Sequence, residues 1–146
     1  MKNKFLLLLL ICALFLSSAS SFAFGFRKKQ KPVLIMTQND PRLGVSYDEK
    51  IPTYEVFKTG QRIYFIIHNP KGFESNFIKY QIVKQDDKAH VGGYTRIRNI
   101  TKRVSDKHQF IDYFTLSEAG KYYLQVFDIT NLHHWLAITS FGVVNE

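Results

Sequence analysis

Two adjacent histidines, His133 and His134, precede Trp135 and are the side chains best suited to metal chemistry. Imidazole nitrogen is a frequent ligand of copper and zinc. Neighbouring residues on a strand point to opposite faces, so the pair could hold one metal ion only from a loop. No HxH or HExxH spacing is present. We therefore expect solvated loop histidines and no cofactor, with a copper or zinc site on His133 and His134 as the alternative.

A run of basic residues from 96 to 103 could bind anions. If the run is a strand, Arg96, Arg98 and Lys102 share one face, and Arg103 follows them. Such a row could bind an anionic polymer, although edge strands also carry charges that prevent aggregation. We expect these four residues either to bind a partner or to protect an edge. Asn99 also begins an Asn-Ile-Thr glycosylation sequon, which has meaning only in a eukaryotic secretory pathway.

Aromatic residues make up 15% of the chain. Strands favour aromatic side chains, and the core of a β-sandwich absorbs many of them. A surplus outside the core, at Phe73, Tyr94 and Trp135, would form a platform for a sugar or a protein. Core and cross-strand packing is the competing expectation.

Recognisable catalytic motifs are absent. The sequence has no GxSxG elbow, Gly-rich phosphate loop or HExxH helix. Asp112 alternates with apolar residues, so it is either a buried acid of raised pKa or the partner of a basic neighbour. We expect no enzyme; the alternative, a small hydrolase or enzyme subunit, predicts a pocket lined by Asp112 or Asp128 and a histidine.

The elements that position these residues are strands. From Pro32 onward, short runs of β-branched and aromatic residues alternate with turn residues, and no helical period is sustained. The predicted strands are 33–37, 43–47, 53–57, 62–68, 77–85, 94–104, 110–116, 121–129 and 135–144, of which the second and third are the weakest. Seven to nine strands at this spacing predict an all-β, single antiparallel sandwich.

The segment from Leu116 to Leu124 narrows the type of sandwich. Its Ser-Glu-Ala-Gly turn followed by Tyr122 resembles the corner before strand F of immunoglobulin-like and fibronectin-like domains. The resemblance implies that Gly120 permits the tight turn and that the Tyr122 hydroxyl bonds to backbone at the corner. It also implies that 135–144 is strand G. A disulfide is excluded because the chain's single cysteine is Cys12.

The N-terminus predicts export. Lys2 and Lys4 precede an apolar run of 12 residues and then small residues, the order of a signal peptide over residues 1–23. The run is too short to span a membrane unless the uncharged tail extends it into a retained anchor. We expect residues 24–31 to be a basic, flexible lead-in and residues 32–146 to be the β-sandwich domain.

The charge balance points to acidic partners. Without Lys2 and Lys4, 18 Lys and Arg oppose 12 Asp and Glu, a net charge of +6. That balance serves solubility and also favours acidic protein patches or anionic glycans. We expect a non-catalytic binding or adaptor module at the cell envelope, periplasmic or secreted, with an envelope protein or an anionic glycan as partner. Nucleic acid is not expected outside the cell, and membrane contact is expected only through a retained N-terminal segment.

Overall fold

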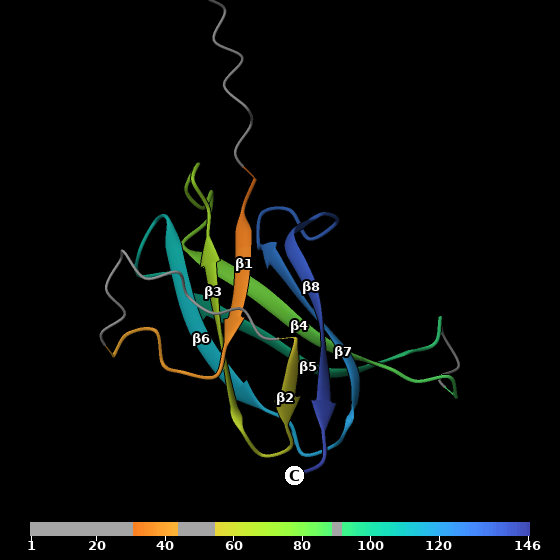
Figure 1. Ribbon diagram of the computed structural model, residues 1–146. Coiled ribbons are helices and arrows are strands. Elements are labelled where there is room, and N and C mark those ends of the chain that lie inside the picture. Colours follow the sequence, from red (N-terminus) through yellow and green to blue (C-terminus); the bar gives the residue numbers. More distant parts are fainter. Residues whose placement is uncertain (1–30, 44–54, 89–91) are drawn as a thin grey trace, which may run out of the picture.

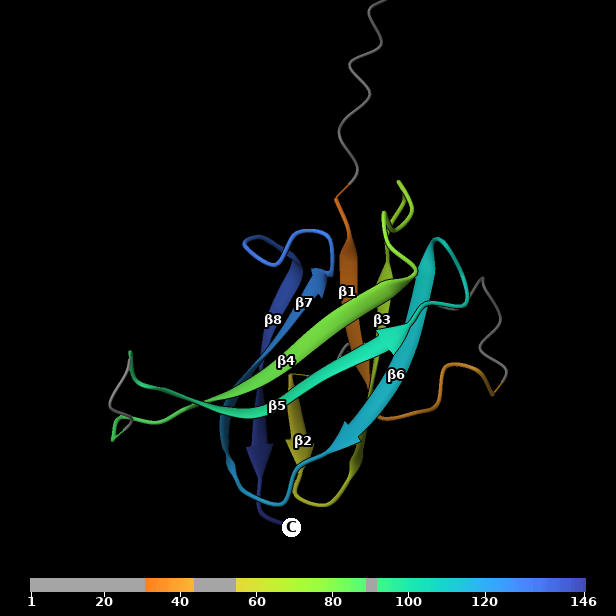
Figure 2. The same cartoon turned by 180° about the vertical axis from the view of Figure 1, so that it is seen from behind.

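The computed structural model describes residues 31–43, 55–88 and 92–146, which form eight strands and no helix. The strands are β1 (Val33–Thr37), β2 (Val56–Lys58), β3 (Arg62–His68), β4 (Phe77–Gln85), β5 (Tyr94–Arg103), β6 (Gln109–Thr115), β7 (Gly120–Asp128) and β8 (Trp135–Val144). One sheet has the order β1-β3-β6, and the other has the order β2-β8-β7-β4-β5. The two sheets face each other as the layers of a single sandwich (Figures 1 and 2), which confirms the predicted fold class.

The strand boundaries agree closely with the sequence pattern. Strands β1, β3, β4 and β8 begin and end at the predicted residues. Of the predicted strand 53–57, Val56 and Phe57 belong to β2, residues 53–54 lie outside the described residues, and Leu43 of the preceding prediction lies in a turn. The rest of the predicted strand 43–47 and the predicted signal segment lie outside the described residues. Within the described ranges, the structure has no helix that is long and apolar enough to cross a membrane.

Alternating side chains of both sheets build the core. Ile63, Phe65 and Ile67 of β3 are fully buried, as the period-2 pattern predicts. Opposite them, Tyr80 of β4 is also fully buried. The Phe65 ring centroid lies 5.0 Å from that of Tyr80 in an edge-to-face pair, and 6.0 Å from that of Phe110. Aromatic packing across the gap therefore ties the two sheets together.

One strand pairing departs from the predicted antiparallel arrangement. Strand β2 lies parallel to β8, with Val56 opposite Gly142. A short turn forces consecutive strands to run antiparallel, but β2 and β8 are distant in the sequence and no turn sets their relative direction. The other five pairings are antiparallel.

The corner between β6 and β7 has the geometry that the sequence predicts. The Tyr122 hydroxyl donates a hydrogen bond of 2.8 Å to the Glu118 carbonyl oxygen. Gly120 has a φ of 154°, and a Cβ atom there would lie 2.7 Å from the Lys84 Cε atom. That φ favours glycine, whereas the flexible end of the Lys84 side chain can move aside for a Cβ atom. The corner and the strand order are consistent with an immunoglobulin-like sandwich in which β7 and β8 stand as strands F and G.

Candidate functional site

Three segments meet at the end of the sandwich where β1 begins, which we call the loop pole (Figure 1). They are residues 31–32, the β3–β4 loop (69–76) and the β7–β8 loop (129–134). A pocket of about 360 Å³ lies between them. Its lining residues are Lys31, Pro32, Asn69, Lys71, Gly72, Glu74, Asp128, Asn131, His134, Trp135 and Leu136. Ligand pockets have volumes of roughly 300–1,000 Å³, so this one suits a single large side chain or a small molecule.

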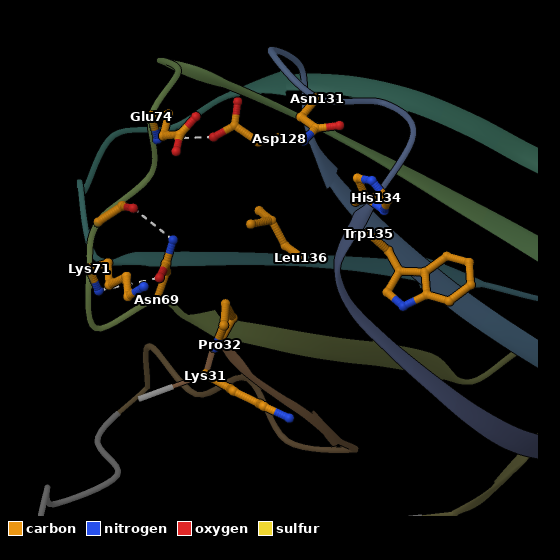
Figure 3. A pocket seen from close by; sticks show the side chains of 11 residues that line it. Lys31, Pro32, Asn69, Lys71, Glu74, Asp128, Asn131, His134, Trp135 and Leu136 are labelled. Carbon is orange, nitrogen blue, oxygen red and sulfur yellow. Dashed lines mark hydrogen bonds between the residues drawn. The ribbon is translucent and has the colours of Figure 1, made fainter. Parts of the chain in front are cut away.

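The pocket has an apolar centre and a polar rim. The Leu136 side chain points into its middle, with Pro32 below and the indole of Trp135 at its margin (Figure 3). Lys71 and Glu74 are exposed and bring opposite charges to the rim. An apolar centre surrounded by a few polar groups is the usual composition of a small-ligand site.

Asn69 holds the β3–β4 loop in shape. Its side-chain Nδ2 donates to the Gly72 carbonyl oxygen at 2.7 Å, and its Oδ1 accepts from the Lys71 amide at 3.3 Å. Its backbone amide donates to the His108 carbonyl oxygen at 2.8 Å. The Phe73 backbone amide donates to the Lys107 carbonyl oxygen, also at 2.8 Å. The β5–β6 loop (104–108) thus supports the pocket from behind, and a supported loop loses little entropy on binding.

Asp128 joins the β3–β4 and β7–β8 loops. Its Oδ2 atom accepts from the backbone amides of Glu74 and Ser75 at 2.9 and 3.2 Å. Its Oδ1 atom accepts from the Thr130 amide and hydroxyl at 3.1 and 2.8 Å. Burial acts to raise the pKa of this carboxyl, but the hydrogen bonds from Thr130, Ser75 and Glu74 outweigh it and lower the pKa. The carboxylate is therefore ionised at neutral pH, and its acceptor positions are taken by its own loops.

The predicted basic row on β5 is split between the two faces of the sheet. A β-bulge interrupts the pairing with β4, so that Arg98 lies opposite Ile82 but Arg96 lies opposite Val83. The extra residue, Ile97, reverses the alternation, as bulges do. Arg98 and Lys102 consequently face the other sheet, whereas Arg96 and Arg103 face outward. The expectation that Arg96, Arg98 and Lys102 share one face is wrong, although β5 is the predicted edge strand.

The two inward cations bind groups of the opposite sheet. The Lys102 Nζ atom lies 2.6 Å from the Asp112 Oδ2 atom, and the Tyr80 hydroxyl donates to the same oxygen at 2.8 Å. Burial and the bond to Asp112 raise the pKa of Tyr80, so it remains a donor. Arg98 Nη2 donates to the Thr115 carbonyl oxygen at 2.9 Å. Asp112 is therefore paired with a basic residue, Lys102, which belongs to the opposite sheet.

The three predicted platform aromatics do not gather. Phe73 is buried in the core cluster. Trp135 and Tyr94 are about half exposed on the five-stranded sheet. Through its partner on β7, Trp135 is level with Lys79 of β4, whereas Tyr94 lies opposite Gln85, six residues further along β4. Six residues along a strand correspond to about 20 Å. The platform expected from the sequence is therefore not formed by these three residues.

The two histidines lie in the loop before β8, and both are exposed. His134 lines the pocket, whereas His133 does not. Among the described ranges, no three His, Cys, Asp or Glu side chains are grouped to hold a metal ion. Met36, a conceivable soft ligand, is buried in the core.

Three pocket residues were named from the sequence in other roles: His134 as a metal candidate, Trp135 in the aromatic platform and Asp128 in the enzyme alternative. The joining of the two loops through Asn69 and Asp128 was not predicted. Asn69 opens an Asn-Pro-Lys-Gly turn, and Asp128 ends a strand just before Ile-Thr-Asn. Asn and Asp favour such positions because their side chains bond to nearby backbone amides. That signal predicts a turn at each position. It does not predict that the two turns meet.

The sequence matches no family model and no curated protein. Solved structures resemble the fold. The PmoD soluble domain from Methylocystis sp. is 16% identical with a TM-score of 0.47, over 77% of this chain and 90% of that one. A superoxide reductase (neelaredoxin) from Ignicoccus hospitalis is 10% identical with a TM-score of 0.42, over 79% and 81%. A CARDB domain from Pyrococcus furiosus in complex with di-metal ions is 17% identical with a TM-score of 0.39, over 79% and 94%.

These comparisons correct one prediction. The absence of catalytic motifs does not exclude an enzyme, so the expectation that the chain is not an enzyme is wrong. Three structures of similar fold are superoxide reductases. Small sandwiches of this kind are therefore found among enzymes as well. With identities of 10–13% and TM-scores near 0.4, the likeness assigns no activity to this chain.

Proposed function

We propose that this protein is an exported, immunoglobulin-like binding module that recognises an envelope protein through the loop pole. The observation that carries the proposal is the pocket of about 360 Å³, which three separate segments form at one end of a rigid sandwich. Binding residues are commonly found on loops that a rigid scaffold positions, and the loops at one end of an immunoglobulin-like sandwich are well suited to that task.

The chemistry of the pocket supports a protein partner. An apolar centre at Leu136 accepts an anchoring side chain, and the charged rim of Lys71 and Glu74 matches polar groups around such an anchor. The hydrogen bonds of Asn69 and Asp128 hold the loops in place before binding. Preorganisation of this kind favours affinity because little order is imposed on association.

The pocket also has the lining that the enzyme alternative predicts, namely Asp128 and a histidine. The Asp128 carboxylate, however, accepts four hydrogen bonds from its own loops. The observed role of Asp128 is therefore to hold in place the two loops that form the pocket.

The test is chemical cross-linking in native envelope, followed by capture of the full chain through a C-terminal tag. The pole variant is Lys71→Glu/His134→Ala. The matched control is Lys88→Glu/Ser117→Ala, which makes the same formal charge change at exposed positions away from the pocket. We expect one dominant protein partner to be retained by the wild type and the control and lost from the pole variant.

Retention of that partner by the pole variant would reject the loop pole as the interface. An absence of any partner, together with copper or zinc binding that His134→Ala abolishes, would replace this proposal with the metal-handling alternative. Isothermal titration with each metal ion distinguishes that case.

A further inference from the structure

The outward face of the five-stranded sheet is strongly basic. Positions on this face are those that alternate with buried residues such as Tyr80 and Leu124. Five of them are cationic: Lys58, Lys79, Arg96, Arg103 and Lys121. No outward-facing strand position of this sheet holds Asp or Glu. We call this surface the basic face.

The cations of the basic face form no ion pair with any described residue. The described residues contain three ion pairs, and all three involve other cations: Arg42, Lys84 and Lys102. The Lys121 Nζ atom lies 5.6 Å from the centre of the Tyr123 ring, a cation–π contact that leaves its charge available. Unpaired cations on a face without carboxylates attract anions from solution.

The spacing of the cations suits an elongated anion. Arg103 lies opposite Phe77, and Arg96 lies opposite Val83. Because a strand advances about 3.3 Å per residue, these two arginines are roughly 20 Å apart along β4. Lys79 lies between them, on the neighbouring strand. A small ion can contact one or two of these side chains, whereas a linear chain of acidic groups can contact them all.

The groups beside and between the cations suit sugar rings. Tyr94 packs edge-to-face on Tyr123 with ring centroids 5.5 Å apart, and Tyr94 is 47% exposed. The amides of Gln81, Asn99 and Gln125 form one row across three adjacent strands. Amides exchange hydrogen bonds with hydroxyl groups, and aromatic rings pack on the apolar faces of sugars. A polypeptide of acidic residues offers neither hydroxyl rows nor flat apolar rings.

We propose that the basic face is a second binding surface, which holds a linear acidic polysaccharide along β4 and β5. Lys79, Arg96 and Arg103 bind its acidic groups, the amide row bonds its hydroxyls, and Tyr94 packs on its rings. This inference is independent of the loop pole, because none of the five cations lines the pocket.

The test measures binding of the full chain to alginate by biolayer interferometry at low and high salt, with neutral dextran and polyglutamate as comparison polymers. The test variant is Arg96→Glu/Arg103→Glu. The matched control is Arg62→Glu/Lys107→Glu, which makes the same charge change on the three-stranded sheet and the β5–β6 loop. Thermal midpoints of both variants establish that they are folded.

We expect alginate to bind, dextran not to bind, and the affinity for alginate to fall as salt rises. The test variant should lose at least tenfold in affinity, and the control should stay within about twofold of the wild type. Tyr94→Ala should weaken alginate binding more than polyglutamate binding. If the test variant and the control lost affinity for alginate equally, net charge alone would explain binding, and the proposal would be overturned.

Polyglutamate binding as tight as that of alginate would also overturn it, because the face would then recognise charge alone. The same holds if the wild type does not bind alginate. The capture experiment tests the loop pole and the alginate experiment tests the basic face, so either proposal can fail while the other stands.

Discussion

At the scale of single residues, Asp128 joins two loops of the loop pole. Four hydrogen bonds converge on its carboxylate from two loops that are more than 50 residues apart in the sequence. Their combined effect lowers its pKa in the folded state despite burial. A carboxyl whose pKa is depressed by folding stabilises the fold above its unfolded pKa, and that contribution is lost as the pH falls through the folded value.

Asp128→Asn should lower the free energy of unfolding at pH 7 by about 1–3 kcal/mol, because asparagine carries no charge and replaces one acceptor oxygen with a donor. The difference from the wild type should shrink as the pH falls below 3.8, the ordinary value for aspartate. Urea unfolding of both proteins, from pH 7 to below pH 3.8, measures this difference in the free energy of unfolding. Asp87→Asn, at an exposed turn, is the control and should change little at any pH.

At the scale of elements, β5 has two separate roles. Its inward-facing cations Lys102 and Arg98 bind β6 across the open side of the sandwich. Figure 2 shows β5 alongside β6 at this edge. Arg96 and Arg103 are left on the outside. The edge strand therefore links the two sheets with one set of cations and presents another set to solvent.

Lys102→Ala should destabilise the fold by about 1–3 kcal/mol, because it removes the cation beside the buried Asp112 carboxylate. Exposure of the Lys102 stem moderates the loss. Arg103→Ala should stay within about 0.5 kcal/mol of the wild type, since its side chain faces outward. Thermal unfolding of the two variants checks this contrast, and equal losses would contradict the inward facing of Lys102 and the outward facing of Arg103.

At the scale of the whole molecule, the aromatic core makes the two sheets one folding unit. Phe65 is fully buried and packs against rings from β4 and from β6. The domain has no disulfide to assist it, since residues 32–146 contain no cysteine. Its stability therefore depends on burial of apolar surface between the sheets.

Phe65→Ala should cost about 3–5 kcal/mol, a large part of the 5–15 kcal/mol that is typical of a domain. Tyrosine fluorescence and far-UV circular dichroism should report a single transition at a lower denaturant concentration. Phe77→Ala, at a side chain that is 45% exposed, should cost much less and provides the control. Two separate transitions would contradict a shared core.

Local pattern determined the strands, most of their buried faces and the corner at Tyr122. Side-chain alternation and turn chemistry depend on neighbours a few residues away, so they can be read directly from the sequence. The pattern placed Ile78, Tyr80 and Ile82 inward, and the structure buries all three.

The tertiary structure alone decided which residues meet. A single extra residue at Ile97 reversed the facing of Arg96, and no local pattern marked it. The parallel pairing of β2 with β8 and the meeting of Leu136 with Lys71 at the pocket join distant parts of the chain. Such contacts depend on how whole strands pair and cross, because the energy that selects them comes from burial summed over the domain rather than from neighbouring residues.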